Sequence, residues 1–320
     1  MTLNQLKVFV LVVRLGSFRA AANALGVSEP AVSQALAALR QSLGDQLVTR
    51  TGPTLTLTSA GQRVVGLASQ MVNLAVAAED AVRAANGDAD LLRVVASANV
   101  GDAVAPALLQ AFARRATNVE VTLGIATSNE MQALLAERLA DVALGPAMAG
   151  PAANGVVSEP LLRYRLLIVA GHAHHAHRAR VRSLAALRHE EWLVDPTATD
   201  PESDLGRLLV GVGVPQTNVR VFPTQPAAWA AAATGTGIAP AIEHLWIRDP
   251  HPDVAPLPVP GTPIELLWHV SMLETDRRPA VARRLHRFLA TPDATQAMYR
   301  ADGGVPASRF RPPVYVTLWS

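Results

Sequence analysis

The stretch SEPAVSQALAALRQSLG, residues 28–44, decides the fold of the first part of the chain. Its apolar residues recur at intervals of four, three and four, at Val32, Leu36, Leu39 and Leu43. At 100° per residue these side chains lie within one narrow arc, so the pattern predicts an amphipathic helix that buries this arc in a core. Ser28 is expected to cap the N-terminus, Pro30 suits the first turn, and Gly44 is expected to end the helix.

The opposite face of this helix carries almost no charge. It holds small and amide side chains, with Ser33 and Arg40 on its flank: Pro30, Gln34, Ala37, Ala38 and Gln41. Two interpretations fit such a face. It belongs either to a small helical bundle and simply faces solvent, or to a surface that a partner approaches closely. An exposed face built of alanine and glutamine favours the second interpretation.

The neighbouring segments indicate the kind of partner. Upstream, Ser17 can cap a helix over 18–25 that Gly26 ends, so a helix, a turn and a second helix follow one another as in a helix-turn-helix. Downstream, two short strands are predicted around a turn at 51–53, as in the wing of a winged helix. In this arrangement the second helix enters the major groove of DNA, where glutamine pairs with adenine and alanine contacts the thymine methyl group.

Candidate DNA contacts follow from this interpretation. The residues expected to face base edges are Ser28, Glu29, Pro30, Ser33, Gln34, Ala37 and Gln41. Arg19 in the first motif helix, and Arg50 and Thr51 in the wing, are expected to contact the DNA backbone. Residues 1–65 hold six basic and two acidic residues, a net charge of +4, whereas the whole chain carries +2. The basic excess therefore lies in the segment that would meet phosphates.

The motifs of the first 60 residues together resemble one family. The segments QLKVFV, GSFRAAANALGVS, PAVSQALAALRQSLGDQLVTR and LTSAG are similar, without a gap, to the N-terminal domain of LysR-type transcriptional regulators. The chain departs from the family at Glu29, where glutamine is usual, and at Gln34 and Ala38, around which a basic residue is usual. Glu29 is expected to stabilise its own helix N-terminus or to accept from cytosine N4. The operator sequence therefore cannot be transferred from relatives.

The resemblance implies a sequence-specific, cytoplasmic transcriptional regulator. Such a protein binds double-stranded DNA at an interrupted inverted repeat as a homodimer or a dimer of dimers, with RNA polymerase as a further candidate partner. Its C-terminal part is a two-lobed α/β domain, like periplasmic binding proteins, that holds a small-molecule effector between the lobes. Two alternatives stay open: a constitutive DNA binder without an effector, and a two-lobed binding protein or enzyme whose N-terminal domain serves only assembly.

A long helix is predicted over 59–86, because the stretch lacks proline and ends at Asn-Gly. Its apolar residues recur at intervals of three and four, at Val64, Leu67, Met71, Leu74, Ala78 and Ala81. This pattern predicts a seam buried in a dimer, with packing on its own domain as the alternative. The expected domains are a winged helix-turn-helix at 1–60 with its motif at about 18–37, a dimerisation helix at 61–86 and, after a hinge at 87–90, an effector domain at 91–300.

Strand-like and helix-like segments alternate from Leu91 onward, which is typical of a parallel α/β arrangement. The run LLRVVAS is expected to be a strand covered on both faces, followed by one helix over 102–115. By the resemblance, lobe I holds about 91–162 and 265–292, and lobe II holds about 163–264. Residues 301–320, rich in glycine and proline, are expected to form an irregular tail.

A ligand in such lobes binds at the carboxyl ends of strands. This rule selects Ser97, Ala98, Asn99, Thr127, Ser128, Asp195, Thr197, Thr224 and Gln225 as effector-binding candidates. For Ser128 and Thr224, capping of the following helix is the alternative role. No lysine or arginine falls in this set, so nothing in it argues for an anionic effector.

Composition excludes several other functions. The chain has no cysteine, which excludes disulfides, thiolate metal sites and cysteine redox sensing, and no stretch is long and apolar enough to span a membrane. Nucleotide-binding and hydrolase motifs are incomplete or missing, so neither a cofactor nor enzymatic activity is expected. Four histidines lie within 172–177, yet the arginines at 178, 180 and 182 would oppose a cation, so no metal site is predicted.

Overall fold

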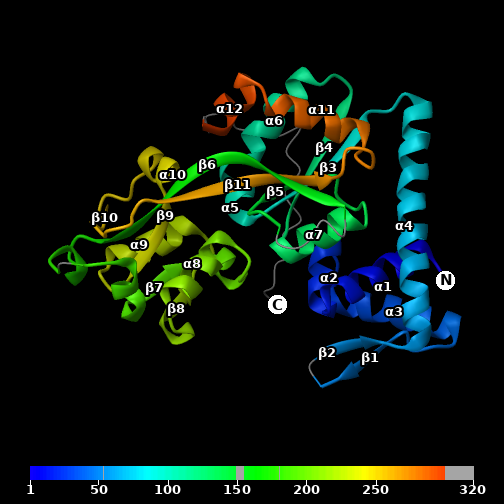
Figure 1. Cartoon of the computed structure of the whole chain (residues 1–320), viewed down its shortest axis with the longest axis horizontal. Coiled ribbons are helices and arrows are strands. Elements are labelled where there is room, and N and C mark those ends of the chain that lie inside the picture. The colour runs from blue at the N-terminus through cyan, green and yellow to red at the C-terminus, as the bar shows by residue number, and fades with distance from the viewer. Residues whose placement is uncertain (53, 149–154, 180, 300–320) are drawn as a thin grey trace.

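Three helices and a hairpin form the N-terminal part of the chain in a computed structural model that describes residues 1–52, 54–148, 155–179 and 181–299. These elements are α1 (Leu3–Leu15), α2 (Phe18–Leu25), α3 (Glu29–Leu43), β1 (Val48–Thr51) and β2 (Thr54–Leu57) (Figure 1). Ser17 and Ser28 cap α2 and α3, and Gly26 and Gly44 end them, as expected from the sequence. The helix-turn-helix and the wing are thereby confirmed, while the predicted tail at 301–320 lies outside the described residues.

The core beneath α3 is smaller than its apolar spacing suggested. Val32, Leu36 and Leu39 are fully buried with Phe9 of α1. Leu43, expected on the same buried face, is 40% exposed. It lies in the last turn of α3, where the helix extends beyond the core, so the prediction for this residue was wrong.

The turn between α3 and the wing is fixed by one carboxylate. Oδ1 of Asp45 accepts from the backbone N–H of Leu47 at 2.6 Å and from the hydroxyl of Thr58 at 2.7 Å. These two bonds lower the pKa of Asp45, and they hold Leu47 at a φ of 59°, in the left-handed region. The Leu47 carbonyl in turn lies so close to Gly61 that a Cβ there would approach it to 2.0 Å. The wing and the following helix are thus locked together at this corner.

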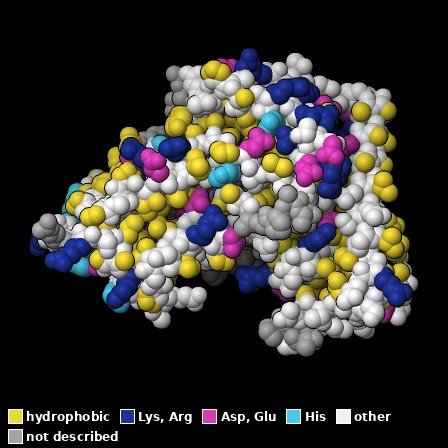
Figure 2. All heavy atoms as spheres, viewed as in Figure 1, with side chains coloured by type: hydrophobic (Ala, Val, Ile, Leu, Met, Phe, Trp, Pro, Cys, Tyr) yellow, Lys and Arg dark blue, Asp and Glu magenta, His cyan; other side chains and the backbone are white. Residues whose placement is uncertain are grey.

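The long helix α4 (Ser59–Asn86) shows two apolar stripes rather than one. Ala68, Val72 and Val76 are buried, and the first two belong to the same core as α1. The seam predicted from the heptad spacing lies on the other side: Val64 is half-buried, and Leu67, Met71, Leu74, Ala78 and Ala81 are exposed. Figure 2 shows apolar side chains along this outer edge. Packing of α4 on its own domain therefore uses a different stripe and leaves the seam uncovered.

A single twisted sheet runs through the C-terminal domain. Its strands are β3 (Asp90–Ala96), β4 (Val119–Ile125), β5 (Val142–Gly145), β6 (Val156–Gly171), β7 (Trp192–Val194), β8 (Val219–Val221), β9 (Ile238–Ile242), β10 (Val254–Pro256) and β11 (Ile264–Leu273). Within the described residues the order is β4-β3-β5-β11-β6-β9-β7-β8, and β10 also pairs with β6. The antiparallel pair β6–β11 is long and joins the parallel strands of one lobe to those of the other (Figure 1). Its register shifts between Trp268 and His269.

Helices cover this sheet on both sides. They are α5 (Ala98–Ala103), α6 (Ala105–Arg115), α7 (Ser128–Ala136), α8 (Asp204–Val212), α9 (Gln225–Ala233), α10 (Glu243–Arg248), α11 (Ala280–Leu289) and α12 (Pro292–Tyr299). Among the described residues, no helix has both the length and the apolar character needed to cross a membrane.

Two local predictions for this domain were wrong. The single helix expected over 102–115 begins earlier, at Ala98, and is broken at Val104. Pro106 explains the break, because it lacks the N–H that a continuous helix would direct at the carbonyl of Asp102. Strand β3 is not buried on both faces: its residues alternate between buried and partly exposed, as in a strand with one fully covered face.

The two domains of the chain touch through α7. Glu137, which follows α7 and is fully buried, accepts from Nε of Arg14 in α1 at 2.9 Å and from the hydroxyl of Ser69 in α4 at 2.5 Å. Met131 and Leu135 of α7 join the same apolar cluster as the core of the N-terminal helices. Helix α7 and the following Glu137 therefore connect the C-terminal domain to α1 and α4 (Figure 1).

Candidate DNA interface and interlobe cleft

The outer face of α3 is open to solvent. The seven residues predicted to face base edges are all exposed: Ser28, Glu29, Pro30, Ser33, Gln34, Ala37 and Gln41. Ser28 has a structural task as well, since its hydroxyl accepts from the N–H of Ala31 at 3.4 Å. The face is therefore flat, uncharged beyond Glu29, and rich in amide donors and acceptors.

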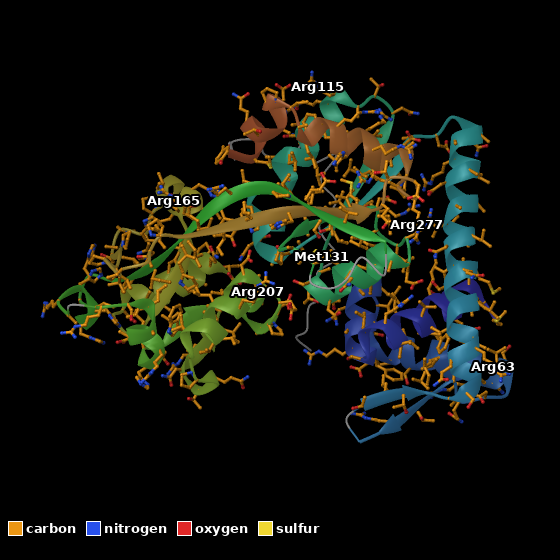
Figure 3. The ribbon with its side chains drawn as sticks, in the orientation of Figure 1. Arg63, Arg115, Met131, Arg165, Arg207 and Arg277 are labelled. Carbon is orange, nitrogen blue, oxygen red and sulfur yellow. The ribbon has the colours of Figure 1, made fainter. Side chains whose placement is uncertain are left out.

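The exposed arginines considered for DNA contact lie on elements other than α3. Arg19 is exposed at the start of α2, and Arg50 is exposed on β1, where its Nε donates to the carbonyl of Gly52 at 3.2 Å. Thr51 ends β1 opposite Thr54. Arg63, which was not among the predicted contacts, is exposed near the start of α4 at the same end of the domain as the wing (Figure 3). These positions suit contacts to a phosphate backbone on either side of a groove.

Arg40 has a different role from the other arginines of the domain. Its Nε donates to the carbonyl of Gln46 at 2.7 Å, and its Nη2 donates to the carbonyl of Val48 at 2.7 Å. The guanidinium thus satisfies two backbone acceptors in the turn that leads from α3 to the wing. It supports the position of the wing, and its charge counts less toward DNA than the sequence suggested.

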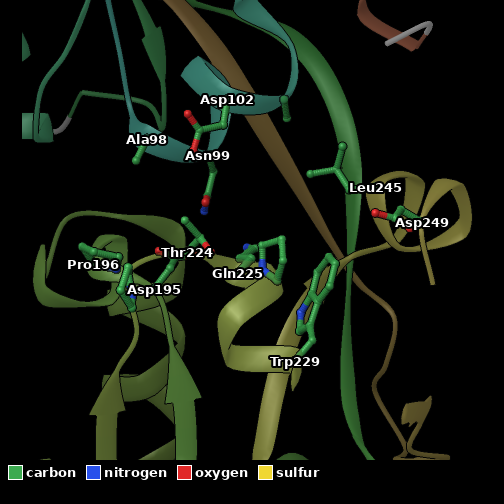
Figure 4. Close-up of a pocket in the computed structure, with 13 residues that line it drawn as sticks. Ala98, Asn99, Asp102, Asp195, Pro196, Thr224, Gln225, Trp229, Leu245 and Asp249 are labelled. Carbon is green, nitrogen blue, oxygen red and sulfur yellow. The ribbon is translucent and has the colours of Figure 1, made fainter. Parts of the chain in front are cut away.

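A cavity of about 280 Å³ lies between the lobes of the C-terminal domain (Figure 4). Its lining comes from both lobes: Ala98, Asn99, Asp102, Ala103, Asp195, Pro196, Pro223, Thr224, Gln225, Pro226, Trp229, Leu245 and Asp249. Five of the nine predicted effector residues are among them, namely Ala98, Asn99, Asp195, Thr224 and Gln225. The rule that ligands bind at the carboxyl ends of strands therefore selected part of the lining in each lobe.

The other four predicted residues are not part of this lining. Ser97 starts α5, and Thr127 caps α7 in a reciprocal pair with Glu130. Ser128 follows that cap as the first helical residue, so the capping role considered for it belongs to Thr127 instead. Thr197 lies next to Asp195 and donates to it. Thr224 has both of the roles that the sequence left open, because it caps α9 and also lines the cavity.

Direct hydrogen bonds already link the lobes beside the cavity. Nδ2 of Asn99 donates to the hydroxyl of Thr197 at 3.3 Å. The backbone N–H of Ser128 donates to Asp200 Oδ2 at 2.9 Å. Three of the predicted residues, Asn99, Ser128 and Thr197, therefore take part in bonds between the lobes.

Eight of the thirteen lining residues were not among the predicted ones, and four of these contribute charged or large apolar side chains. Asp102 belongs to α5, which was not predicted as a separate helix, and Leu245 and Asp249 belong to or follow α10, which was not predicted. Trp229 lies one helical turn beyond the predicted pair at the start of α9. The sequence did contain a signal for Trp229, because it lies about one helical turn after Thr224, the threonine that follows β8 and caps α9.

The histidine-rich loop forms a compact cluster with one carboxylate. Nε2 of His175 lies 3.0 Å from Glu190 Oε2, and Nε2 of His174 lies 3.6 Å from the same oxygen. Nδ1 of His174 accepts from the backbone N–H of Ala176 at 3.2 Å, so the proton of the neutral ring is on Nε2. Desolvation lowers the pKa of His174, which favours this neutral form. In this tautomer Nε2 of His174 carries the proton, which a metal ion held by His174, His175 and Glu190 would have to displace.

Comparison with known proteins assigns the class of this molecule. The family model for the bacterial regulatory helix-turn-helix protein, lysR family, matches residues 3–62, and the LysR substrate binding domain matches residues 85–292. An uncharacterized HTH-type transcriptional regulator of Mycobacterium tuberculosis is 33% identical over the whole of both chains. The HTH-type transcriptional regulator CfxR of Cupriavidus necator is 27% identical over 97% of each chain.

Solved structures show the same fold. CbnR, a LysR family transcriptional regulator, has a TM-score of 0.53 at 23% identity, over 93% of this chain and 99% of that one. Full-length BenM has a TM-score of 0.53 at 18% identity, over 93% and 98%. The chain is thus a helix-turn-helix DNA-binding regulator joined to an α/β substrate-binding domain. It belongs to the family of LysR-type transcriptional regulators.

Proposed function

We propose that this protein reads an interrupted inverted repeat of double-stranded DNA through α3 and changes its DNA-bound state when a small molecule enters the interlobe cavity. The observation that carries the proposal is the exposed, capped and nearly uncharged face of α3, next to a wing that carries Arg50. Gln34 and Gln41 offer bidentate amides to adenine, and Ala37 offers a methyl contact to thymine. Arg19, Arg50 and Arg63 supply sequence-independent attraction to phosphates.

Dimerisation through α4 would place two such faces on one DNA site. Leu67, Met71 and Leu74 are 60%, 44% and 70% exposed in the single chain, an unusual cost for large apolar side chains in water. Pairing of two seams removes this cost and relates the reading helices by a two-fold axis, which matches an inverted repeat. A dimer of dimers in the cytoplasm, with RNA polymerase as a partner, completes the proposed assembly.

Effector response would work by a population shift. The cavity is bounded by both lobes, so a ligand that fills it stabilises one arrangement of the lobes over others. That arrangement reaches the DNA-binding domain through α7 and Glu137, which contact α1 and α4. The spacing of the two reading helices, and hence the bend of the DNA, would then depend on the ligand.

The test is binding of the full-length protein to DNA from upstream of its own gene, followed by fluorescence anisotropy. A scrambled duplex serves as control, and two salt concentrations separate phosphate from base contacts. Preference for the native sequence, reduced in Gln34→Ala and kept in the distant variant Gln216→Ala, supports the proposal. Equal and weak binding to both duplexes by the unmodified protein contradicts it. Specific binding that no small molecule alters would instead favour a constitutive DNA binder.

A further inference from the structure

The walls of the interlobe cavity are acidic. Asp102, Asp195 and Asp249 line it, and its described lining contains no lysine, arginine or histidine. The aspartates come from different segments: Figure 4 shows Asp102 on α5 and Asp249 after α10. Asp195 and Asp249 place two carboxylates in a partly enclosed space, which favours cations over anions.

Asp195 provides the most specific indication of a ligand. The residue is only 3% exposed. Its Oδ1 accepts from both the backbone N–H and the hydroxyl of Thr197, whereas its Oδ2 is buried and has no hydrogen-bond partner in the described part of the chain. A buried carboxylate oxygen without a donor is costly, and such oxygens in native proteins usually have an explanation. A ligand that carries N–H donors would supply the missing bond.

Of the helices whose first turns line the cavity, α9 offers little to an anion. Helix α9 starts at Gln225, but the N–H of Ala227 is taken by the capping hydroxyl of Thr224 at 3.4 Å. Pro226 has no N–H to donate. Two of the donors that make a helix N-terminus an anion site are therefore unavailable here.

The remaining wall of the cavity is apolar. Trp229 directs its only polar atom away from a ligand, because Nε1 donates to the carbonyl of Pro240 at 3.0 Å. Leu245 and Pro226 extend this surface. A volume of about 280 Å³ lies at the lower end of the range for small-molecule sites, so the cavity suits a compact ligand.

We propose that the effector is a small organic cation, with ammonium or guanidinium N–H groups bonded to Asp195 and an apolar part against Trp229 and Leu245. This inference rests on the proposed function, because it names the ligand class of the same cavity. Arg207 on α8 is paired with Asp204 at 3.1 Å and with Glu202 at 3.8 Å, and it is not among the residues that line the cavity.

The experiment measures thermal stability and calorimetric binding of the full-length protein with butylammonium, putrescine and butylguanidinium. Butyrate is the anion of matched size, and tetramethylammonium is a cation without N–H groups. At equal ionic strength, the proposal expects at least one N–H cation to raise the Tm, with little effect of butyrate or tetramethylammonium. Stabilisation by butyrate alone, or none by any N–H cation at millimolar concentration, overturns it.

The variant Asp195→Asn tests the role of the buried carboxylate. It keeps the shape and an acceptor for Thr197 but removes the charge, so it should bind the N–H cation at least about ten-fold more weakly. Its own Tm without ligand should equal or exceed that of the unmodified protein, because an unpaired buried charge has been removed. Asp293→Asn, which alters a surface pair with Arg115, is the matched control and should bind unchanged. Equal affinity of all three proteins contradicts the assignment.

DNA binding measured on the same preparations separates the two levels of inference. Specific DNA binding with no response to N–H cations means that the regulator is correctly assigned and its ligand class is wrong. Cation binding at Asp195 without specific DNA binding means the opposite: the cavity is correctly assigned, and the proposed regulatory function fails.

Discussion

The two candidate sites of this molecule are built in opposite ways. The DNA-facing surface is one face of one helix, α3, whose residues follow one another within 28–41. The interlobe cavity is assembled from segments between Ala98 and Asp249 that meet only because the sheet folds them together. The first site is open and carries one charged side chain, Glu29, whereas the second is acidic and partly enclosed.

This difference teaches which kind of site a sequence reveals. A site on a single helix inherits the period of 3.6, so its members can be selected by spacing alone. A site between lobes depends on which loops the topology brings together, and spacing selects only those members that directly follow a strand. The predictions that follow test the two sites by effects of decreasing size.

The largest effect is expected for the seam of α4, on which the reading of two half-sites depends. Leu74→Glu places a charge in a seam whose burial we propose, and should convert the dimer to monomers. Loss of the second reading helix is expected to weaken operator binding by about 100-fold or more. Sedimentation and anisotropy on one sample measure both quantities. Leu74→Met, which keeps the side chain apolar, should retain both, and a dimeric Leu74→Glu protein would break the proposed assembly.

A second test concerns the junction between α4 and the effector domain. Asp141 accepts from the backbone N–H of Arg93 at 2.8 Å, and the same arginine binds Asp80 of α4 at 2.7 Å. Burial raises the pKa of Asp141 to about 6, although the bonds from Arg93 oppose this shift. Because the pKa of Asp141 is higher in the folded than in the unfolded chain, the protonated carboxyl stabilises the folded state. This contribution to the free energy of unfolding is fully present below pH 3.8 and is lost as the pH rises through about 6.

Asp141→Asn removes this titration while keeping a side chain of similar shape. Between about pH 4 and 6.5, the free energy of unfolding of the unmodified protein should fall relative to the variant by up to about 3 kcal/mol. Urea unfolding at several pH values gives this difference, in which other titrations cancel. A difference that does not change with pH would show that Asp141 titrates in the ordinary range.

A smaller effect is expected at the reading face itself. Gln34→Ala should reduce the discrimination between the operator and a single-base variant by about 1–3 kcal/mol, because one bidentate amide is lost. Binding to unrelated DNA should change little. Competition anisotropy with a panel of single-base operator variants locates the affected base pair. An unchanged preference at every base pair would exclude Gln34 from the residues that contact base edges. The description of the outer face of α3 as the DNA-reading surface would then be wrong at this residue.

The smallest effect is expected for the wing. Arg50→Ala should weaken binding to all duplexes by a similar factor and reduce the salt dependence of binding by about one phosphate contact. The measurement is the slope of affinity against salt concentration for specific and scrambled duplexes. A loss confined to the specific duplex would instead assign Arg50 to base recognition.

The fold could be predicted largely from local signals. Serine caps, glycine stops and the spacing of Val32, Leu36 and Leu39 give α2 and α3, and alternation of apolar runs gives most of the sheet. Leu43 failed because spacing says which face a residue lies on but not where the core ends. Pro106 was a visible signal for the break before α6, since a proline ring cannot continue the preceding helix.

The lining residues of the cavity also fall into two groups, those that local signals in the sequence reveal and those that depend on the folded arrangement. Asp195 and Thr224 were found because each follows a strand. Asp102 and Asp249 were not found, because their positions in the lining depend on α5 and α10. The starts of these two helices carry no side-chain cap that the sequence could reveal. The acidic character of the cavity could therefore not be inferred from the strand ends alone. It required the positions of α5 and α10.

The pair β6–β11 has one more consequence. It runs through both lobes, so any rotation of one lobe against the other must bend these two strands. The register shift between Trp268 and His269, opposite Leu162 and Pro160, interrupts the ladder between them. Because a bulge loosens regular pairing, bending costs least at this point. The pair is therefore expected to bend at this one position when the lobes rotate. The fastest amide hydrogen exchange within the pair is expected at the same position.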